Sequence, residues 1–433
     1  MESSPKLSLA SAIFINLNVM IGAGIFINTY ALSTTAGAAG FLLYPLVGLC
    51  MLPLIAVTGK LLEYFPTGGL YAFGSSYHPF LGFLSCWSYF FGKLASASVM
   101  LTFATAMFQQ LIPSLQSIDP LYMSLVILSI FTFLNLQNLK TGMIVQTFFL
   151  TTKSIPILFA CLAGVLLFDT SAIHPENFIW SGVIINIPLV LYCLAGFETA
   201  CSLSRNIENP SVNGPKAVYY SFAIIMMLYG IFQGFVYMNT HATLTSMTSY
   251  KDIFPAIAQA LCSSPMLAHK VSLSISFAMG MSALGGAYSI LFANSWNLYT
   301  LAEHRHTFMA PMLTQLNKYQ TPWVAVLCEA ITCTIFLIFN QSSILPLQRT
   351  ATLGIVIAYT ISTFAYVHLA KQHNRSLRIK TLAILACMSC VLFVYNCATS
   401  FIQTGIAPLF LFMTILSIGT IMFFASKKSI SAL

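Results

Sequence analysis

Two apolar segments of this chain are interrupted near their middles, and these interruptions limit its fold more than any other feature. The first segment, about residues 7–32, carries Gly22-Ala23-Gly24 at its centre, and the sixth, about 182–203, carries Ala195-Gly196-Phe197-Glu198. Glycine inside a helix costs about 1 kcal/mol relative to alanine, and a carboxylate at membrane depth costs more. Irregular backbone inside a bilayer persists only where protein buries it or where it lines a cavity. Paired breaks of this kind point to the binding site of a secondary transporter.

The composition excludes a water-soluble globular protein. Of the 433 residues, 58% are hydrophobic and 6% are charged, and the mean hydropathy is +0.84, whereas soluble domains carry about 25% charged residues. Apolar runs of about 20 residues match a hydrocarbon core about 30 Å thick. The sequence therefore predicts an all-α integral membrane protein with twelve transmembrane helices. These helices are expected at about 9–33, 40–60, 80–111, 120–138, 143–168, 181–203, 217–239, 271–301, 323–340, 346–369, 380–398 and 405–425.

The 18 lysine and arginine residues are distributed unequally between the two sides of the predicted helices. Thirteen lie on the side of the N-terminus, three lie on the opposite side, and Lys93 and Lys153 lie inside apolar runs. The positive-inside rule therefore predicts that both termini are cytoplasmic and that the protein resides in the plasma membrane, as in a bacterial inner membrane. A nucleic-acid partner would need a contiguous basic patch and is not expected. The thirteen are Lys6, Lys60, Lys140, Arg205, Lys216, Arg305, Lys318, Lys371, Arg375, Arg378, Lys380, Lys427 and Lys428.

The twelve predicted helices form a single domain, residues 1–433. Helices 1–5 (about 9–168) and 6–10 (about 181–369) can be superposed so that their breaks coincide, since Gly22 and Gly196 are 174 residues apart. Because five is odd, the second set begins on the opposite side of the membrane, so the repeats are inverted. Two extra helices, about 380–425, complete the predicted fold.

In chain order, several short motifs resemble those of the amino acid–polyamine–organocation (APC) superfamily of permeases. The resemblance covers about residues 9–370 and implies a five-plus-five inverted repeat, alternating access, and amino acids or related amines as substrates. One motif departs from the family pattern, because Trp296 stands where an arginine often precedes the Tyr-Leu-Ala stretch of helix 8. A gating ion pair from that arginine is therefore not expected. The matching motifs are Asn18-Val19-Met20-Ile21-Gly22-Ala23-Gly24-Ile25-Phe26, Glu63-Tyr64-Phe65-Pro66-Thr67-Gly68-Gly69-Leu70-Tyr71, Gly196-Phe197-Glu198, Glu208-Asn209-Pro210, Leu298-Tyr299-Thr300-Leu301-Ala302 and Thr321-Pro322-Trp323.

The two breaks suit the two charged groups of an α-amino acid. Half-helix N-termini carry about +0.5 charge and C-termini about −0.5, so amides at the first break suit a carboxylate and carbonyls at the second suit an ammonium. In similar permeases an aromatic residue of helix 6 closes over the substrate, and Tyr192 matches it; plain packing is the alternative. The expected carboxylate site comprises Ile21, Gly22, Ala23, Gly24 and Ile25, and the expected amine site comprises Tyr192, Leu194, Ala195 and Gly196.

Four ionisable residues, Lys93, Lys153, Glu198 and Glu329, lie inside predicted helices, where charge is costly and points to function. The resemblance implies that Glu198 is a coupling or gating carboxylate; a conformational lock on free backbone amides is the alternative. For Glu329 we expect a structural pairing.

Both buried lysines are assigned to the site. Similar proton-coupled permeases have a lysine in helix 5 that faces the first break, so Lys153 is the expected coupling residue. Burial can lower the pKa of a lysine by several units, enough for it to gain and lose a proton during a cycle. Snorkelling of its ammonium to the membrane interface is the alternative. Lys93, near the middle of helix 3, is expected to line the side-chain pocket and to disfavour cationic substrates. Alternatively, it pairs with Glu198 or Glu329, or it faces away from the cavity.

These observations predict a secondary amino acid transporter that is driven by protons. An amino acid/amine exchanger and a nutrient sensor that binds without transport are the alternatives. No nucleophile–base arrangement, phosphate loop or metal-ligand pattern is apparent, so neither an enzyme nor a cofactor is expected. The expected partners are a small-molecule substrate, protons or a counter-substrate, and lipid.

Overall fold

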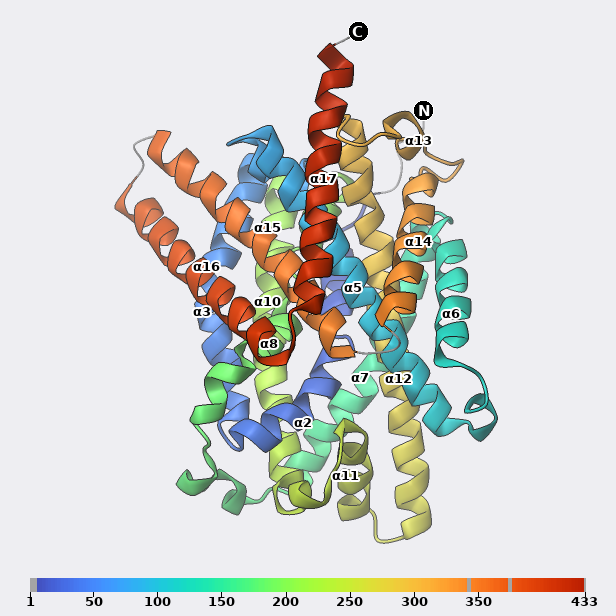
Figure 1. Cartoon of the computed structure of the whole chain (residues 1–433). Helices are drawn as coiled ribbons and strands as arrows, with labels where there is room; N and C mark the ends of the chain where they lie inside the picture. The colour runs from blue at the N-terminus through green and yellow to red at the C-terminus, as the bar shows by residue number, and fades with distance from the viewer. Residues whose placement is uncertain (1–5, 341–343, 373–375, 432–433) are drawn as a thin grey trace.

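The computed structural model describes residues 6–340, 344–372 and 376–431, and these are almost entirely helical (Figure 1). Within these residues, ten apolar segments have the length and composition to cross a membrane, if the bent pair α1–α2 is counted as one span. Two further apolar helices, α6 (Pro120–Asn135) and α14 (Trp323–Asn340), are shorter. The total of twelve spans therefore stays a prediction, as does the inverted repeat. The ten segments are α1–α2 (Leu9–Met20, Gly24–Ala36), α3 (Gly40–Tyr64), α5 (Pro79–Leu111), α7 (Leu139–Leu166), α8–α9 (Ser181–Leu194, Thr199–Ser202), α10 (Pro210–Thr240), α12 (Pro265–Glu303), α15 (Ile344–Gln372), α16 (Leu377–Thr404) and α17 (Ala407–Ser431).

Helix starts follow local sequence signals. Three long helices, α5, α10 and α12, and the shorter α6 carry proline in their first turn, where the missing amide hydrogen costs nothing and φ is already helical. Asn138 caps α7 by accepting a hydrogen bond from the amide of Thr141 at 2.8 Å, which satisfies one of the otherwise unpaired amides of the first turn. Short helices connect the spans: α4 (Gly69–Ser75), α11 (Ile253–Leu261) and α13 (Ala310–Leu313).

Both predicted breaks are present. The axes of α1 and α2 differ by 48° across residues 21–23, and a side chain at Gly22 would collide with the tip of Met100 from α5. The second break separates α8 from α9, and within it Gly196 has a φ of 131°, which non-glycine residues rarely adopt. Glycine thus allows the backbone to unwind here and neighbouring helices to approach closely.

The two broken segments lie against a central group of long helices. Helix α5 is the most enclosed of the long helices and packs against α12 and α15, while α1 packs against α7, α10 and α12. By contrast, α16 and α17 are largely exposed, and Figure 1 shows α16 along one edge of the molecule. The most buried helices therefore surround the breaks, and the two additional helices cover part of the outside.

Leu7, which precedes α1, is held beside the loop that follows α9. The amide of Leu7 donates to the carbonyl of Asn206 at 2.7 Å, and the amide of Glu208 donates to the carbonyl of Leu7 at 2.9 Å. Arg375, one of the thirteen basic residues of the predicted cytoplasmic side, lies outside the described residues, as do the side chains of Lys427 and Lys428. The orientation of the termini remains a prediction from charge.

Candidate functional site

The first break brings a buried lysine against the end of α1. Lys153 of α7 is fully buried, and its ammonium donates to the carbonyl of Asn18 at 2.8 Å and to the carbonyl of Ile21. These are carbonyls of the last turn of α1, where the helix no longer supplies amide partners. No ion pair to Lys153 is found in the described part of the chain. The lysine therefore lies where the resemblance predicts it, held by neutral carbonyl groups.

The start of α2 presents backbone amides next to an aromatic ring. Gly24 and Ile25 begin α2, so their amides have no acceptor within the helix. A Cβ atom on Gly24 would lie 3.0 Å from the ring of Tyr192 and 3.1 Å from the sulfur of Cys193. The Tyr192 hydroxyl and the Ser96 hydroxyl lie 3.0 Å apart and share a hydrogen bond. The expected aromatic residue of the second break thus lies directly over the first break.

At the second break, the Glu198 side chain folds back onto the unwound backbone. Its Oε2 accepts a hydrogen bond from the amide of Gly196 at 2.8 Å and another from the hydroxyl of Tyr359 at 2.8 Å. Its Oε1 accepts from the hydroxyl of Tyr89 at 3.2 Å and forms an ion pair with Lys93 at 2.8 Å. Four donors therefore fix this fully buried carboxylate.

The Lys93–Glu198 pair is one of the alternatives that the sequence left open for Lys93. The Lys93 ammonium also lies over the ring of Tyr89, 5.3 Å from the ring centroid. Lys93 nevertheless borders the cavity between the breaks, so the structure combines the pocket position with the internal pairing. The amide contact from Gly196 to Glu198 likewise matches the conformational lock considered for that residue.

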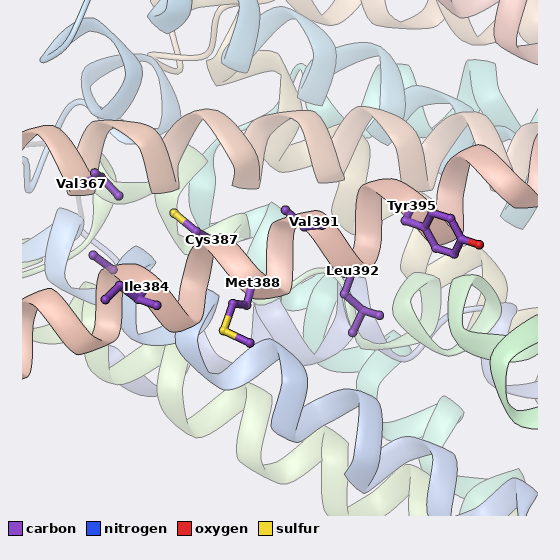
Figure 2. A pocket seen from close by; sticks show the side chains of 8 residues that line it. Val367, Ile384, Cys387, Met388, Val391, Leu392 and Tyr395 are labelled. Atoms are coloured by element: carbon purple, nitrogen blue, oxygen red, sulfur yellow. The ribbon is translucent and has the colours of Figure 1, made fainter.

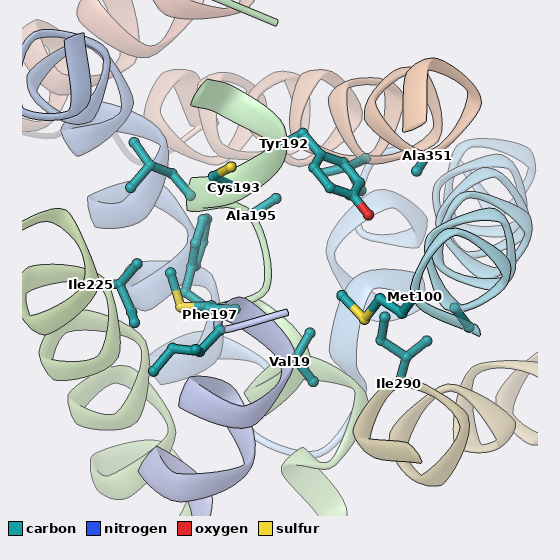
Figure 3. Close-up of a cluster of buried hydrophobic side chains, with 14 of the residues drawn as sticks. Val19, Met100, Tyr192, Cys193, Ala195, Phe197, Ile225, Ile290 and Ala351 are labelled. Carbon is teal, nitrogen blue, oxygen red and sulfur yellow. The ribbon is translucent and has the colours of Figure 1, made fainter. Parts of the chain in front are cut away.

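A cavity of about 10 Å³ lies between the two breaks and can hold about one water molecule. Figure 3 shows Tyr192, Ala195, Val19 and Met100 converging there from α8, the second break, α1 and α5. A second cavity of about 10 Å³ lies on another side of Lys93, next to α9 and α12. An amino acid would require side chains in this region to move apart. The first cavity is lined by Val19, Met20, Gly24, Lys93, Ser96, Met100, Tyr192, Cys193, Ala195 and Ile355.

Of the predicted site residues, Gly24, Lys93, Tyr192 and Ala195 line this cavity. The others are buried at the breaks but are not among its lining residues; these are Ile21, Gly22, Ala23, Ile25, Leu194, Gly196, Lys153 and Glu198.

Sequence reasoning missed several lining residues. Ser96 follows Lys93 by three positions and so shares its helix face, a signal that could have identified it. Ile355 and the Glu198 partner Tyr359 come from α15, and no local pattern marks them because their contacts depend on tertiary packing.

Glu329 does not form the expected pairing. It is 1% exposed, lies beside Asn294 of α12, and has no ion pair among the described residues. Both of its carboxyl oxygens also lack a hydrogen bond of normal geometry within that part of the chain.

An arginine from another segment lies against Trp296, the residue that departs from the family motif. Arg205, just after α9, forms an ion pair with Glu303 at 2.8 Å and donates to the hydroxyl of Thr300 at 3.3 Å. Its guanidinium lies over the rings of Tyr299 and Trp296, at 5.1 and 6.0 Å from their centroids. An ion pair made by an arginine of another segment therefore lies next to this part of α12, where Trp296 replaces the arginine of the family pattern.

Known proteins resemble this chain over most of its length. A family model described as amino acid permease matches residues 7–424. The amino-acid permease AapA of Bacillus subtilis is 25% identical over 342 residues, which cover 74% of this chain and 70% of that protein. The aromatic amino acid transport protein AroP of Salmonella typhimurium is 21% identical over 365 residues, covering 80% and 76% of the two chains. An uncharacterized transporter of Mycobacterium tuberculosis, Rv1999c, is 23% identical over 428 residues, covering 94% and 90%.

The family match spans nearly the whole chain, including both breaks, and places the protein among multi-pass membrane transporters rather than enzymes. The chain belongs to the amino acid permease family, within the APC superfamily.

Proposed function

We propose that this permease is a proton-coupled secondary transporter that carries amino acids across the plasma membrane by alternating access, with both termini in the cytoplasm. The observation that carries the proposal is the contact of the Lys153 ammonium with the carbonyls of Asn18 and Ile21. A lysine held by neutral carbonyls can release its proton without leaving an unpaired anion behind. Proton loss would weaken both hydrogen bonds at the end of α1, beside the substrate cavity.

In this proposal the substrate lies between the breaks. Its carboxylate accepts hydrogen bonds from amides in the stretch from Ile21 to Ile25, where the positive end of α2 favours an anion. Its ammonium donates to carbonyls of the stretch from Tyr192 to Ala195, at the negative end of α8. The close approach of Gly24 to Tyr192 supports this arrangement, because the two breaks are then within reach of one small molecule.

Alternating access is supported by the size of the cavity. Space for about one water molecule cannot hold an amino acid, so binding requires Tyr192, Met100 or the broken helices to move. We infer that the Tyr192–Ser96 hydrogen bond breaks and re-forms during this movement.

The test begins with purified full-length protein and the twenty amino acids. A ligand present at 100 times its Kd stabilises a protein by about 2.7 kcal/mol, so a rise in the thermal unfolding midpoint identifies candidate substrates. Uptake of those substrates is then measured in proteoliposomes with and without an inward proton gradient. The proposal predicts gradient-driven accumulation.

Other outcomes would identify the alternatives. Uptake that requires amino acid on both sides and ignores the proton gradient would indicate an exchanger. Binding without uptake or counterflow would indicate a sensor. Either result would overturn the proton-coupled mechanism.

A further inference from the structure

An apolar groove of about 670 Å³ runs along α16 beside α15, on the outside of the molecule (Figure 2). From Ala383 to Tyr395 it covers twelve helical steps, or about 18 Å at 1.5 Å per residue. This length is close to the hydrocarbon thickness of one leaflet, about 15 Å or half of the bilayer core. The groove is lined by Val367, Ala383, Ile384, Cys387, Met388, Val391, Leu392 and Tyr395.

Two lysines flank one end of the groove. Lys371 follows the lining residue Val367 by four positions on α15, and Lys380 precedes the lining residue Ile384 by four positions on α16. Residues four apart on a helix are neighbours on one face. Each lysine therefore lies on the same helix face as a residue that lines the groove, and both lie beyond the same end of it. Both lysines are exposed, and neither forms an ion pair with a described residue.

The surrounding sequence offers these lysines no acidic partner. Glu329 is the last acidic residue of the chain, and the 104 residues after it contain seven lysines and arginines. Arg378, also exposed, adds a third described cation near the same end of the groove. An apolar groove with cations at one end is complementary to a molecule that has a hydrocarbon tail and an anionic head.

We propose that this groove binds an anionic phospholipid, with an acyl chain along α16 and the phosphate between Lys371 and Lys380. Neither lysine belongs to the proposed substrate or coupling site. A neutral lipid would use the groove but would leave the lysines without a counter-charge. A second copy of the chain is a poorer occupant, because a symmetric contact would bring two basic ends of the same kind together.

The test titrates purified full-length protein with phosphatidylglycerol and with phosphatidylcholine of identical chains, and it measures binding by native mass spectrometry. Each lysine near a membrane surface contributes about 1 kcal/mol toward an anionic headgroup. Two lysines therefore predict about thirtyfold tighter binding of phosphatidylglycerol, at 1.4 kcal/mol per tenfold. The double variant Lys371→Gln/Lys380→Gln should reduce this preference to near unity. The double variant Lys140→Gln/Lys216→Gln removes the same amount of charge from exposed positions elsewhere. This control should retain the preference for phosphatidylglycerol.

A second pair of variants tests the apolar part of the site. Val391→Trp fills the groove and should weaken the binding of both lipids, whereas Ile421→Trp, at an exposed position of α17, should not. Equal binding of the two lipids by the wild type, or equal losses in the two double variants, would overturn the proposal. So would a dimer that Val391→Trp converts to a monomer without changing lipid binding, because the groove would then be a contact between copies.

Discussion

The ammonium of Lys93 and the carboxylate of Glu198 lie 2.8 Å apart between α5 and the second break, and both side chains are almost completely shielded from solvent. Sequence reasoning treated Lys93 chiefly as a free charge in the pocket. Its pairing with Glu198 changes the local electrostatics, because the two charges cancel, whereas Lys153 has no ionic partner among the described residues. Two predictions follow from this contact.

The first concerns stability. Removing one partner of a buried ion pair leaves an unpaired charge and costs about 3–5 kcal/mol, so Lys93→Met should lower the thermal unfolding midpoint strongly. The double variant Lys93→Met/Glu198→Gln should recover part of the loss. Lys60→Met breaks an exposed pair with Glu63, which is worth about 0–1 kcal/mol, and serves as the control. Similar midpoints for Lys93→Met and Lys60→Met would show that the buried pair has no such role.

The second concerns substrate charge. An isolated cation 4 Å from a cationic side chain would cost about 4 kcal/mol at an effective dielectric of 20, but Glu198 compensates Lys93. The excess positive charge of Lys153 should still disfavour arginine, lysine and polyamines, although by less than this amount. Competition uptake with neutral, acidic and basic amino acids measures the preference, in wild type and in Lys93→Ala. A wild type that prefers arginine or a polyamine would contradict this expectation.

The third prediction concerns the start of α2. Gly24→Leu should abolish amino acid binding while the protein still inserts, because the new side chain would occupy the space between Gly24, Tyr192 and Cys193. Gly230→Leu is the matched control, since Gly230 lines a surface groove and its Cβ would meet neighbours only at 3.5 Å or more. Thermal shift with the identified substrate reads out binding. Normal binding by Gly24→Leu would place the substrate elsewhere.

The fourth prediction concerns the Arg205–Glu303 pair. Because both side chains are partly exposed, Arg205→Gln should change stability by less than about 1 kcal/mol. We expect it to loosen the contact with Trp296 and Tyr299 and to expose Cys86, whose thiol donates to the carbonyl of Asn297 at 3.4 Å. Maleimide labelling of Cys86, followed by mass spectrometry, should be faster than in wild type. Unchanged labelling would mean that this cluster does not restrict access.

The sequence predicted the backbone of the site better than its side-chain contacts. Glycine and proline act locally, so Gly22, Gly24 and Gly196 identified both breaks, and the bounds predicted for α5 differ from those observed by one residue. The contacts of Glu198 with Tyr359 and of Arg205 with Glu303 join residues 161 and 98 positions apart. Such contacts arise from helix packing, which no local pattern in one chain encodes.

Proton-gradient dependence in Lys153→Ala is the most direct test of the proposed mechanism. Uptake of an identified substrate is measured in proteoliposomes with and without an inward proton gradient, and counterflow without a gradient serves as the control for substrate binding and movement. If Lys153 carries the coupled proton, the variant should lose the stimulation by the gradient and retain counterflow. Stimulation equal to that of the wild type would contradict a coupling role for Lys153.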